Sequence, residues 1–432
     1  MRRRGRLSQR GGKSPMEDVP WVVGGPGWRA TVCDSALMDA SWLEGFLEDP
    51  SGRRVGKEDT MLSSRRSLCS ILMLVLLSGG ASLSAAPTVE EAVNLIASRL
   101  DQEQVKDGLD AGAWPLEMYF TGPIAAGMVC AYERTEDPAY LASAHLAGQW
   151  IFDTAAVYGA LLGDETYAFT RLSELSEDPN QNPWRDALVD FFLSHRNPDI
   201  TGTTEEYLRV FEELEPSTAT YHIAYLLVAA DYVQDADVDV YRQALLRYLS
   251  GVDDKADFPV MALGVATWAL IATDTPAETL VASDDAVPNS YWEGLTVGDL
   301  PELLAGHQVP EGEVLAGSFY WRFDHTDGGT EGVIAGYTED TIFGTLGLIA
   351  AALKDPEGAG EPADLAIAAA EQALLSGIDE DGLVYLHLAM QGPTYNAFAG
   401  EMLQALWSVE EYWDWRAEME MEMEAEVVAE QE

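Results

Sequence analysis

The chain has 432 residues, of which 25 are basic and 73 acidic, so its net charge at pH 7 is −48. This charge excludes nucleic acid and anionic membrane surfaces as main partners, because both would repel the chain. The apolar fraction of 47% and the length suffice for a large buried core.

The amino-terminal part differs from the rest of the chain and divides into two segments. Residues 1–60 are rich in Arg, Gly and Ser without helical or strand periodicity, so we expect a non-native upstream extension that is disordered. From Met61, two arginines, an apolar run over Ser70–Leu77 and several small residues follow in the order of a secretory signal peptide. The run is shorter than the about 20 residues of a spanning helix, although an N-terminal membrane anchor remains the alternative. We therefore expect a signal peptide at 61–86 and a periplasmic or extracellular protein.

Residues 87–432, the expected mature protein, carry 13 basic and 64 acidic side chains and a net charge of −51. Such a charge favours solubility and indicates a saline environment, where salt screens the repulsion between like charges. Cys130 is the only cysteine in this range, which excludes an intrachain disulfide and a cysteine-ligated zinc cluster. We expect a monomer with one domain at 87–416, and an acidic tail at 417–432 that is solvated or extends the last helix.

Two kinds of segment with helical periodicity alternate along the whole domain. One kind is apolar on all sides, and its six members begin near Thr121, Glu165, Ser217, Phe258, Thr338 and Tyr395. The other kind has one apolar face, and its six members begin near Thr88, Asp137, Asn182, Val238, Thr296 and Glu361. A helix that is apolar all round is buried, whereas a helix with one apolar stripe lies at the surface. With no competing strand pattern, the sequence predicts an all-α fold, an (α/α)6 toroid with an inner and an outer ring.

The links from outer to inner helices are mostly longer than those from inner to outer helices. Four of them cover residues 101–116, 197–214, 309–336 and 377–392. Loops of this length in a compact domain are usually functional or disordered. In a toroid these loops emerge on one face, which also holds the amino ends of the inner helices, where free N–H groups favour anions. We therefore predict a site in a funnel at the amino ends of the inner helices.

The densest polar and aromatic group lies in the longest loop, at Tyr320, Trp321, Arg322, Asp324 and His325. Aromatic faces next to charged groups suit sugar binding. Arg322 could neutralise a carboxylate through two hydrogen bonds, and His325 or a tyrosine could transfer protons. The alternative is a structured loop in which Arg322 pairs with Asp324 and the aromatic rings pack on the rim.

Carboxylates recur near the starts of the apolar helices, at Glu117, Glu165, Glu339, Asp340 and Glu401. Two of them could act as the acid and the base of glycoside hydrolysis. A glutamate inside an apolar helix, such as Glu401, needs a partner or a raised pKa, which makes it a candidate general acid. Glu339 and Asp340 could instead cap their helix.

The remaining candidates are mostly ring side chains. Tyr167 and His222 complete the catalytic set, although a histidine in an apolar helix is commonly a core residue whose hydrogen bonds are satisfied. The substrate-binding candidates are Trp114, Tyr119, Tyr320, Trp321, Asp324, Tyr337, Tyr395 and Asn396. We predict no metal site, because no histidine pair or carboxylate cluster shows metal-ligand spacing. The sequence requires no cofactor, and its many acids would admit calcium without specifying where.

Two loops share the short pattern Gln-x-x-x-Gly, at Gln104–Gly108 and Gln308–Gly312. The pattern resembles the Gln-x3-Gly-x-Trp repeat of terpenoid cyclases and protein prenyltransferase β-subunits, and similar loops in α/α-toroid polysaccharide lyases. The segment Asp137–Leu141 is similar to the start of outer helices in toroid glycoside hydrolases. The resemblance implies the toroid fold over about 88–412.

Departures from the repeat limit what it implies about chemistry. Asp110 and Val314 stand where the repeat has Trp, and the Asp-x-Asp-Asp acid motif of the class II cyclases is missing from the sequence. The sequence also lacks a suitable cysteine for the zinc site of the prenyltransferases. The chemistry of those families is therefore not implied together with the fold.

The leading hypothesis is a secreted carbohydrate-active enzyme, either a glycoside hydrolase or a polysaccharide lyase, whose partner is an oligo- or polysaccharide. In a lyase, a tyrosine or histidine would take the proton next to a uronate carboxylate, and Arg322 would neutralise that carboxylate. One alternative is a non-catalytic toroid that binds a ligand or a partner protein. The other is a terpenoid-cyclase-like enzyme, against which export and the missing acid motif argue. The side chains that converge at the mouth of the inner ring decide among these functions.

Overall fold

The structure is a computed structural model that describes residues 87–115, 117–158, 161–176, 181–195, 202–282, 290–325 and 334–431. The expected extension at 1–60 and signal peptide at 61–86 lie outside the described residues, so both remain predictions. Among the described helices, none has the length and apolar content that crossing a membrane requires.

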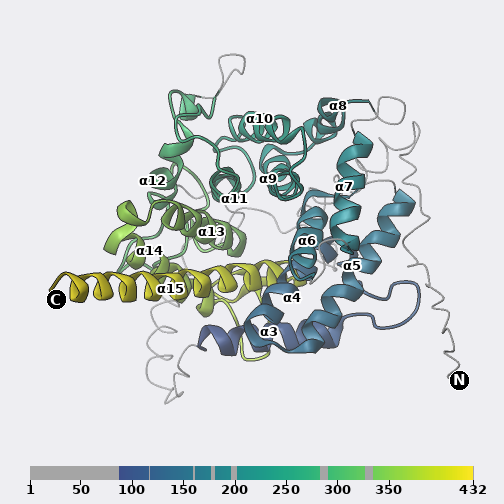
Figure 1. Ribbon diagram of the computed structural model, residues 1–432, viewed down its shortest axis with the longest axis horizontal. Helices are drawn as coiled ribbons and strands as arrows, with labels where there is room; N and C mark the ends of the chain where they lie inside the picture. The colour runs from purple at the N-terminus through teal and green to yellow at the C-terminus, as the bar shows by residue number, and fades with distance from the viewer. Residues whose placement is uncertain are drawn as a thin grey trace, which may run out of the picture.

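Six buried helices form the inner ring in the described part of the chain. They are α4 (Thr121–Thr135), α6 (Gly163–Glu174), α9 (Pro216–Val233), α11 (Pro259–Ala272), α13 (Thr338–Lys354) and α15 (Asn396–Gln431). Each helix packs against the next in this order, and α15 packs against α4, so the ring is closed. Figure 1 shows this arrangement, with α15 running past the other helices at its carboxyl end.

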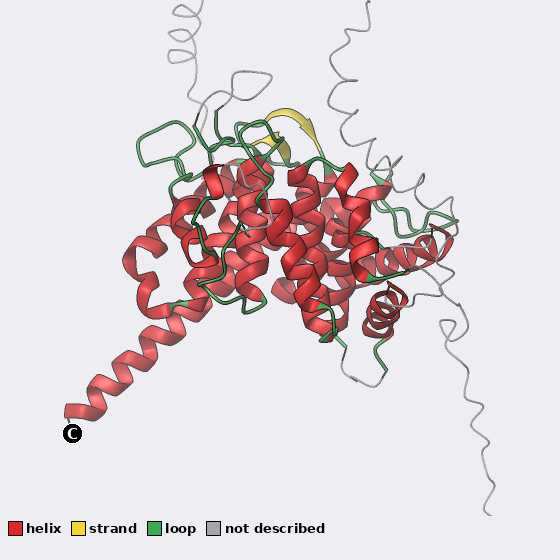
Figure 2. Ribbon diagram, turned by 90° about the horizontal axis from the view of Figure 1, so that it is seen from above, coloured by secondary structure: helices red, strands yellow, loops and turns green. Residues whose placement is uncertain are grey.

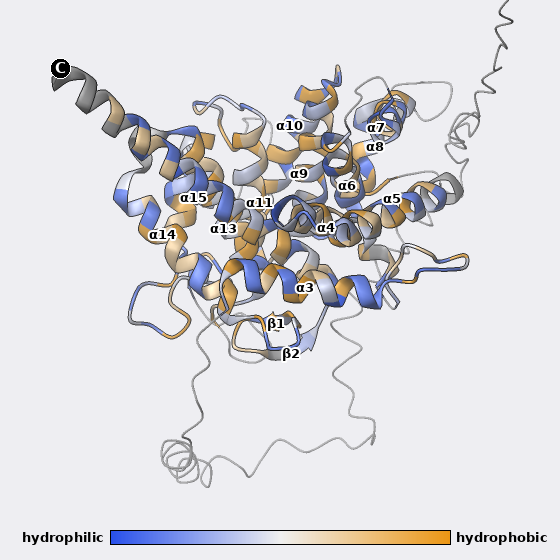
Figure 3. Cartoon of the chain, turned by 60° about the horizontal axis from the view of Figure 1, so that its bottom comes forward, coloured by the Kyte–Doolittle hydropathy of each residue, from blue (hydrophilic) through white to orange (hydrophobic). Residues whose placement is uncertain are grey.

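Six further helices surround the inner ring. They are α3 (Val89–Glu103), α5 (Pro138–Tyr158), α7 (Pro183–His195), α10 (Val238–Leu249), α12 (Leu300–Ala305) and α14 (Pro356–Ser376). Each contacts two neighbouring inner helices. In Figure 3, α3 shows hydrophilic and hydrophobic residues alternating along its length, as expected of a helix with one buried face. The predicted (α/α)6 toroid is therefore confirmed.

The predicted helix starts are set by side-chain caps. Thr88 accepts a hydrogen bond from the Glu91 backbone N–H, and Glu91 accepts one from the Thr88 N–H, which is a capping box. Asp137 Oδ1 accepts from the Ala139 N–H at 2.9 Å, ahead of α5. Asn182 Oδ1 accepts from the backbone N–H three residues later, ahead of α7. These local signals explain why α3, α5 and α7 begin where the sequence predicts, whereas α14, expected from Glu361, begins at Pro356 with a kink at Gly360.

Three elements differ from the sequence-based prediction. A short antiparallel hairpin, β1 (Tyr385–His387) and β2 (Gln391–Thr394), lies in a segment where we expected no strand. The fifth outer helix, expected over 296–307, consists of one 3-10 turn, η4 (Val297–Asp299), and the six residues of α12. The remaining short elements are α8 (Thr204–Leu208), η1 (Met118–Phe120), η2 (Arg209–Glu213) and η3 (Ser290–Trp292).

The last helix does not end near residue 416, which agrees with the second of the two alternatives given for the acidic tail. α15 continues to Gln431, so the acidic tail extends the helix within the described residues. The ion pair of Arg416 with Asp364 on α14, 2.7 Å long, is near the point where the helix leaves the ring. Figure 2 shows the free part of α15 projecting from the body of the molecule.

The two Gln-x-x-x-Gly loops hold neighbouring outer helices together. Gln104 Nε2 donates to the carbonyls of Gly112 and Ser143, at 3.0 and 2.9 Å, and so ties its loop to α5. Gln308 Nε2 donates to Gly317 and Ala366 at the same distances, and ties its loop to α14. The shared pattern is therefore structural in both loops.

The loops that precede the inner helices contact one another in sequence around the ring. Glu117 accepts from the Ala397 N–H, Glu215 accepts from the Asp257 N–H, and Asp254 accepts from the Phe323 N–H. Tyr337 pairs with His387 in the hairpin. These contacts confirm that the loops gather at one end of the ring, which we call the amino face. Figure 2 shows the strands and several loops on one side of the helices.

Candidate functional site

One hydrogen bond crosses the centre of the inner ring. The hydroxyl of Tyr221 on α9 donates to Oε1 of Glu401 on α15, at 2.8 Å. Helices α9 and α15 are three places apart in a closed ring of six, so they stand opposite each other. Tyr221 and Glu401 are each the sixth residue of their helix, which places them at one level near the amino face. Both side chains must therefore point to the ring axis.

Glu401 is buried among other acids. Only 2% of the residue is exposed, and its Oε2 atom has no hydrogen-bond partner among the described residues. Burial raises its pKa well above the usual value, Glu339 and Asp164 raise it further, and the hydrogen bond from Tyr221 opposes them. A raised pKa is the direction of shift that a general acid needs.

Asp164 and Glu339 face each other across the same end of the ring. Each is the second residue of its helix, and α6 and α13 are opposite members of the ring. Asp164 is 3% exposed and Glu339 is partly buried. Both lie about one helical turn nearer the amino face than the level of Glu401, and the charges of both raise the pKa of Glu401. The amino face thus brings together acids from α6, α13 and α15.

Two other predicted acids cap helices. Glu165 Oε2 accepts from the Leu162 N–H at 2.7 Å, at the start of its own helix. Asp340 Oδ1 accepts from the Met261 N–H of the neighbouring helix α11 at 2.8 Å, so it caps α11 and not α13. Burial and the nearby charge of Glu339 raise the pKa of Asp340 well above its usual value, against the effect of that hydrogen bond. These contacts favour a structural role for both residues.

The stability of the fold should depend on the protonation of Glu165. Burial and Asp164 raise its folded pKa from 4.5 to about 8, so its stabilising contribution is complete below about pH 4.5 and is lost as the pH rises to about 8. We expect Glu165→Gln to flatten the fall in melting temperature between about pH 5 and about pH 9. Glu401 and Asp340 shift in the same direction and should leave a residual slope.

A matched variant separates this effect from a general change in charge. Glu212→Gln makes the same replacement at an exposed side chain, and it should leave the pH dependence of melting unchanged. If Glu165→Gln and Glu212→Gln gave the same slope as the unmodified chain, the buried, protonated state of Glu165 would be wrong.

His222 lies next to this acid group on α9. Its Nδ1 atom is 3.7 Å from Asp164 Oδ1, too far for a hydrogen bond. Burial lowers the pKa of His222 to about 4, so the ring is neutral at pH 7. Its ring meets that of Tyr221 edge to face at 5.1 Å. His222 is therefore near the site, and a neutral imidazole there can position Tyr221 by packing.

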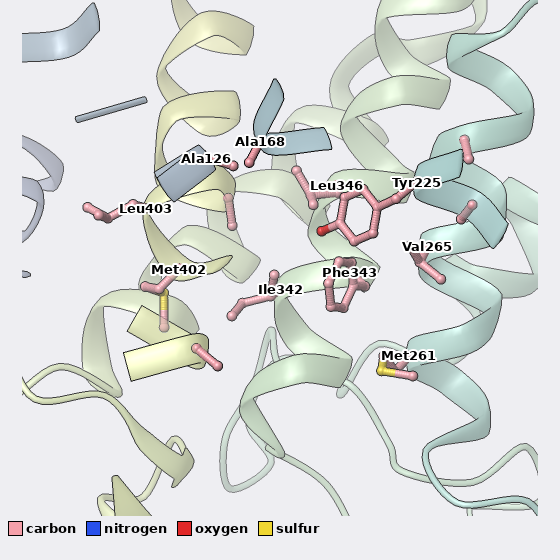
Figure 4. Packing of buried hydrophobic residues seen from close by; sticks show 14 of the residues in the cluster. Ala126, Ala168, Tyr225, Met261, Val265, Ile342, Phe343, Leu346, Met402 and Leu403 are labelled. Carbon is pink, nitrogen blue, oxygen red and sulfur yellow. The ribbon is translucent and has the colours of Figure 1, made fainter. Parts of the chain in front are cut away.

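Aromatic rings from neighbouring inner helices contact one another. The rings of Tyr167, Tyr225 and Trp268 contact one another with centroids 4.9 to 5.4 Å apart. Figure 4 shows Tyr225 beside Phe343, whose centroids are 6.4 Å apart. Burial raises the pKa of Tyr167 far above the neutral range, so this hydroxyl is not a base. These rings belong to α6, α9 and α11 and pack together inside the inner ring.

Predicted sugar-binding rings lie at the rim of the amino face. Trp321 packs against Phe258 and Tyr337, with centroids 5.9 and 5.6 Å away. The Arg322 guanidinium lies 4.4 Å from the centroid of the Trp321 ring. Tyr395 is partly buried, and its pKa is raised by burial, then by Glu117 and Glu339. Tyr337 and Tyr395 therefore stand near the acids, whereas Arg322 stacks on the rim.

Other members of the longest loop form a separate group. His325 Nε2 lies 2.9 Å from His307 Nδ1, and the Tyr291 hydroxyl lies 3.0 Å from His307 Nε2. Tyr320 stacks on His325 with centroids 4.0 Å apart, and its hydroxyl donates to Glu313. Asp324 donates its backbone N–H to Asp254. His325, Tyr320 and Asp324 thus belong to the loop's own structure.

Three predicted residues are corrected by their contacts. Trp114 is 0% exposed and donates its indole N–H to the Leu100 carbonyl at 2.8 Å, so it is a core residue and not a substrate contact. Asn396 bonds through both ends of its amide to α3, at Arg99 and Glu103. Glu117 caps α15. The side chain of Tyr119 lies outside the described part of the structure.

The described residues contain no group of three or more His, Cys, Asp or Glu side chains placed to hold a metal ion. The sequence analysis missed Tyr221 and did not include Asp164 among its candidates. The signal for Tyr221 was its spacing from the start of α9, which matches that of Glu401 from the start of α15.

Comparisons with known proteins find solved structures that are similar to this one. Neither the scan of protein-family models nor the search of curated proteins gives a match. Similar solved structures include a family 88 glycosyl hydrolase from Bacteroides vulgatus, with 14% identity, a TM-score of 0.47, and coverage of 76% of this chain and 100% of that one. A polysaccharide lyase has 14% identity, a TM-score of 0.49, and coverage of 76% and 97%.

A third similar structure is an α-1,6-mannanase from Salegentibacter sp., with 11% identity, a TM-score of 0.49, and coverage of 75% of this chain and 100% of that one. At these similarities the comparisons assign no family and say nothing of the substrate. The toroid is established by the closed ring of helix contacts.

Proposed function

We propose that this chain hydrolyses glycosidic bonds in an oligo- or polysaccharide, with Glu401 as the general acid. The observation that carries the proposal is the hydrogen bond from Tyr221 to Glu401 across the ring axis, beside the acids Asp164 and Glu339. A buried protonated carboxyl with a second carboxylate close by is what this reaction needs.

The reaction divides the work between two acids. Glu401 gives its proton to the oxygen of the leaving sugar as the bond between that oxygen and the anomeric carbon breaks. Water then supplies hydroxide to the anomeric carbon, and its proton goes to a carboxylate. Asp164 and Glu339 are the two candidates for this carboxylate. Tyr221 holds Oε1 of Glu401, so the proton can be presented through the unpartnered Oε2.

The placement of Arg322 disfavours the lyase alternative. A lyase needs a cation at the uronate carboxylate and a base for the neighbouring proton. Arg322 stacks on Trp321 at the rim, and His325 bonds to His307. The Gln-x-x-x-Gly loops tie helices together and do not form an apolar cavity, which removes the support for a cyclase.

The test is cleavage of a panel of soluble oligosaccharides by the purified chain 87–432. Release of new reducing ends without absorbance from a new double bond supports hydrolysis. Absorbance from a double bond would instead identify a lyase and overturn the proposal. Binding without cleavage across the panel would favour a non-catalytic toroid.

We also propose that residues 61–86 direct export of the chain and that the exported protein is a monomer. Amino-terminal sequencing of the protein secreted from cells that express residues 61–432 tests the first point. A product that begins near residue 87 is expected, and an uncleaved product would contradict it. Sedimentation of the same product tests the second point.

A further inference from the structure

The amino ends of the inner helices carry acids and no Lys or Arg, although Arg99, Lys106, Lys255 and Arg322 lie in the described segments beside them. In the first eight residues of the six inner helices there are five acidic residues and no Lys or Arg, and the one histidine there, His222, has its pKa lowered by burial to about 4. Among the described loops, Lys106 pairs with Asp101, and Arg322 stacks on Trp321. The expectation that the helix amino ends would favour an anion is therefore reversed by the side chains at those ends.

Helix capping explains the carboxylates in the first turns of the inner helices, but it does not explain Glu401. A carboxylate in the first turn of a helix offsets the positive end of the helix dipole, and Glu165 and Asp340 fill that role. Glu401 lies beyond the first turn of α15, where no free N–H of its own helix needs it. Its Oε2 atom is buried and has no hydrogen-bond partner among the described residues, as is also true of His222 Nδ1 and the Tyr225 hydroxyl on α9.

A buried polar atom without a partner costs folding free energy, and a ligand that hydrogen-bonds to it would remove that cost. Asp164 and Glu339 lie on opposite helices of the ring, each at the second residue of its helix, and the charges of both raise the pKa of Glu401. The carboxylate of a uronate bound here would be repelled by the carboxylates of Asp164 and Glu339. A substrate amine would instead form charge-assisted hydrogen bonds with these carboxylates.

We propose that the glycan bound at this site contains amino sugars whose amino groups are free and positively charged. The proposal rests on the proposed glycan cleavage and names its substrate class. Asp164 and Glu339 receive the ammonium groups, and the acetylated or uronate forms of the same sugars bind less well. The net charge of −51 over 87–432 attracts such a polymer from solution.

The experiment measures binding and cleavage separately on matched glycans. Oligosaccharides with the same linkage and length are compared in four forms, carrying hydroxyl, acetamido, amino or carboxylate groups, in both α-1,4 and β-1,4 linkage. Binding is measured by calorimetry with Glu401→Gln, which cannot donate the proton, and cleavage is measured with the unmodified chain. We expect the amino form to bind about tenfold or more tighter than the acetamido form, with the difference shrinking as salt is added.

Two variants test which carboxylates recognise the amine. Asp164→Asn and Glu339→Gln should each reduce the preference for the amino form by about tenfold or more. Glu313→Gln, at the rim beside Tyr320, removes the same charge away from the axis and should leave the preference unchanged. If the preference survived both axial variants, the assignment to this site would be wrong.

The outcomes separate the two proposals. Equal or tighter binding of the hydroxyl or carboxylate form would overturn the amino-sugar inference, even if that form were cleaved. Tight binding of the amino form with no cleavage of any form would support the inference and overturn the proposed hydrolysis. Cleavage that follows the binding order would support both.

Discussion

Replacing Glu401 with glutamine is expected to lower kcat for glycan cleavage by about 10²- to 10⁴-fold, because the amide cannot supply the proton to the leaving oxygen. The fold should persist, since glutamine has nearly the same shape and its carbonyl can still accept from Tyr221. The measurement compares the initial rates at which the variant and the unmodified chain cleave the same oligosaccharide, together with the melting curves of both proteins. KM should change little, because the loss falls on the transition state.

The pH dependence of kcat distinguishes a general acid from a merely structural residue. The Tyr221 hydrogen bond lowers the pKa of Glu401, and the charge of Glu339 raises it. Tyr221→Phe should therefore move the alkaline limb of the profile to higher pH. Glu339→Gln should move this limb to lower pH, because it removes a repelling charge. Opposite shifts, or none, would show that Glu401 is not the group that titrates in the alkaline limb.

The matched control for Glu401→Gln replaces a different buried acid near the amino face, Glu165, with glutamine. Glu165→Gln also neutralises a carboxyl with a raised pKa, but this carboxyl caps its own helix at Leu162. Its effect on kcat should be small compared with that of Glu401→Gln. Equal losses in both variants would indicate that general disturbance of the acid group, and not proton donation, lowers the rate.

The ring of helices was predictable because periodicity reports burial directly. Helices such as α11, with an apolar sequence over Pro259–Ala272, need burial on every side, and a closed double ring provides it. Starts such as Thr121 and Thr338 coincide with the observed bounds, although neither has a side-chain cap. The hairpin formed by β1 and β2 was missed because its strands are too short to show alternation.

The candidate site was predictable only in part, because adjacent residues on a buried helix differ by about 100° in direction. An apolar helix offers no polar face from which its rotation can be read. The sequence therefore pointed to His222 and passed over Tyr221, although the latter bonds to Glu401. Trp114 was predicted to contact substrate for a related reason. Its position after the Gln-x-x-x-Gly pattern does not indicate on which side its ring packs, and the ring packs in the core.

Closure of the ring depends on a contact between two glycines, so we expect Gly127→Ala to destabilise the protein by about 3 kcal/mol. A Cβ on Gly127 of α4 would lie 2.8 Å from the carbonyl carbon and the Cα of Gly400 on α15, and backbone cannot move aside locally. Helix propensity alone predicts the opposite sign, a gain of about 1 kcal/mol for alanine in place of glycine. Urea unfolding of the variant and the unmodified chain therefore decides between packing and propensity by the direction of the change.

Gly148→Ala in α5 is the control, because the new Cβ there would meet the ends of the Leu172 and Trp184 side chains, which can shift. It should cost less than Gly127→Ala. Gly400 directly precedes Glu401, so spreading α4 from α15 should also displace the proton donor from Tyr221 and lower kcat. A Gly127→Ala protein with unchanged stability would mean that α4 and α15 do not close the ring by this contact. Loss of stability with full activity would mean that the geometry of Glu401 does not depend on ring closure.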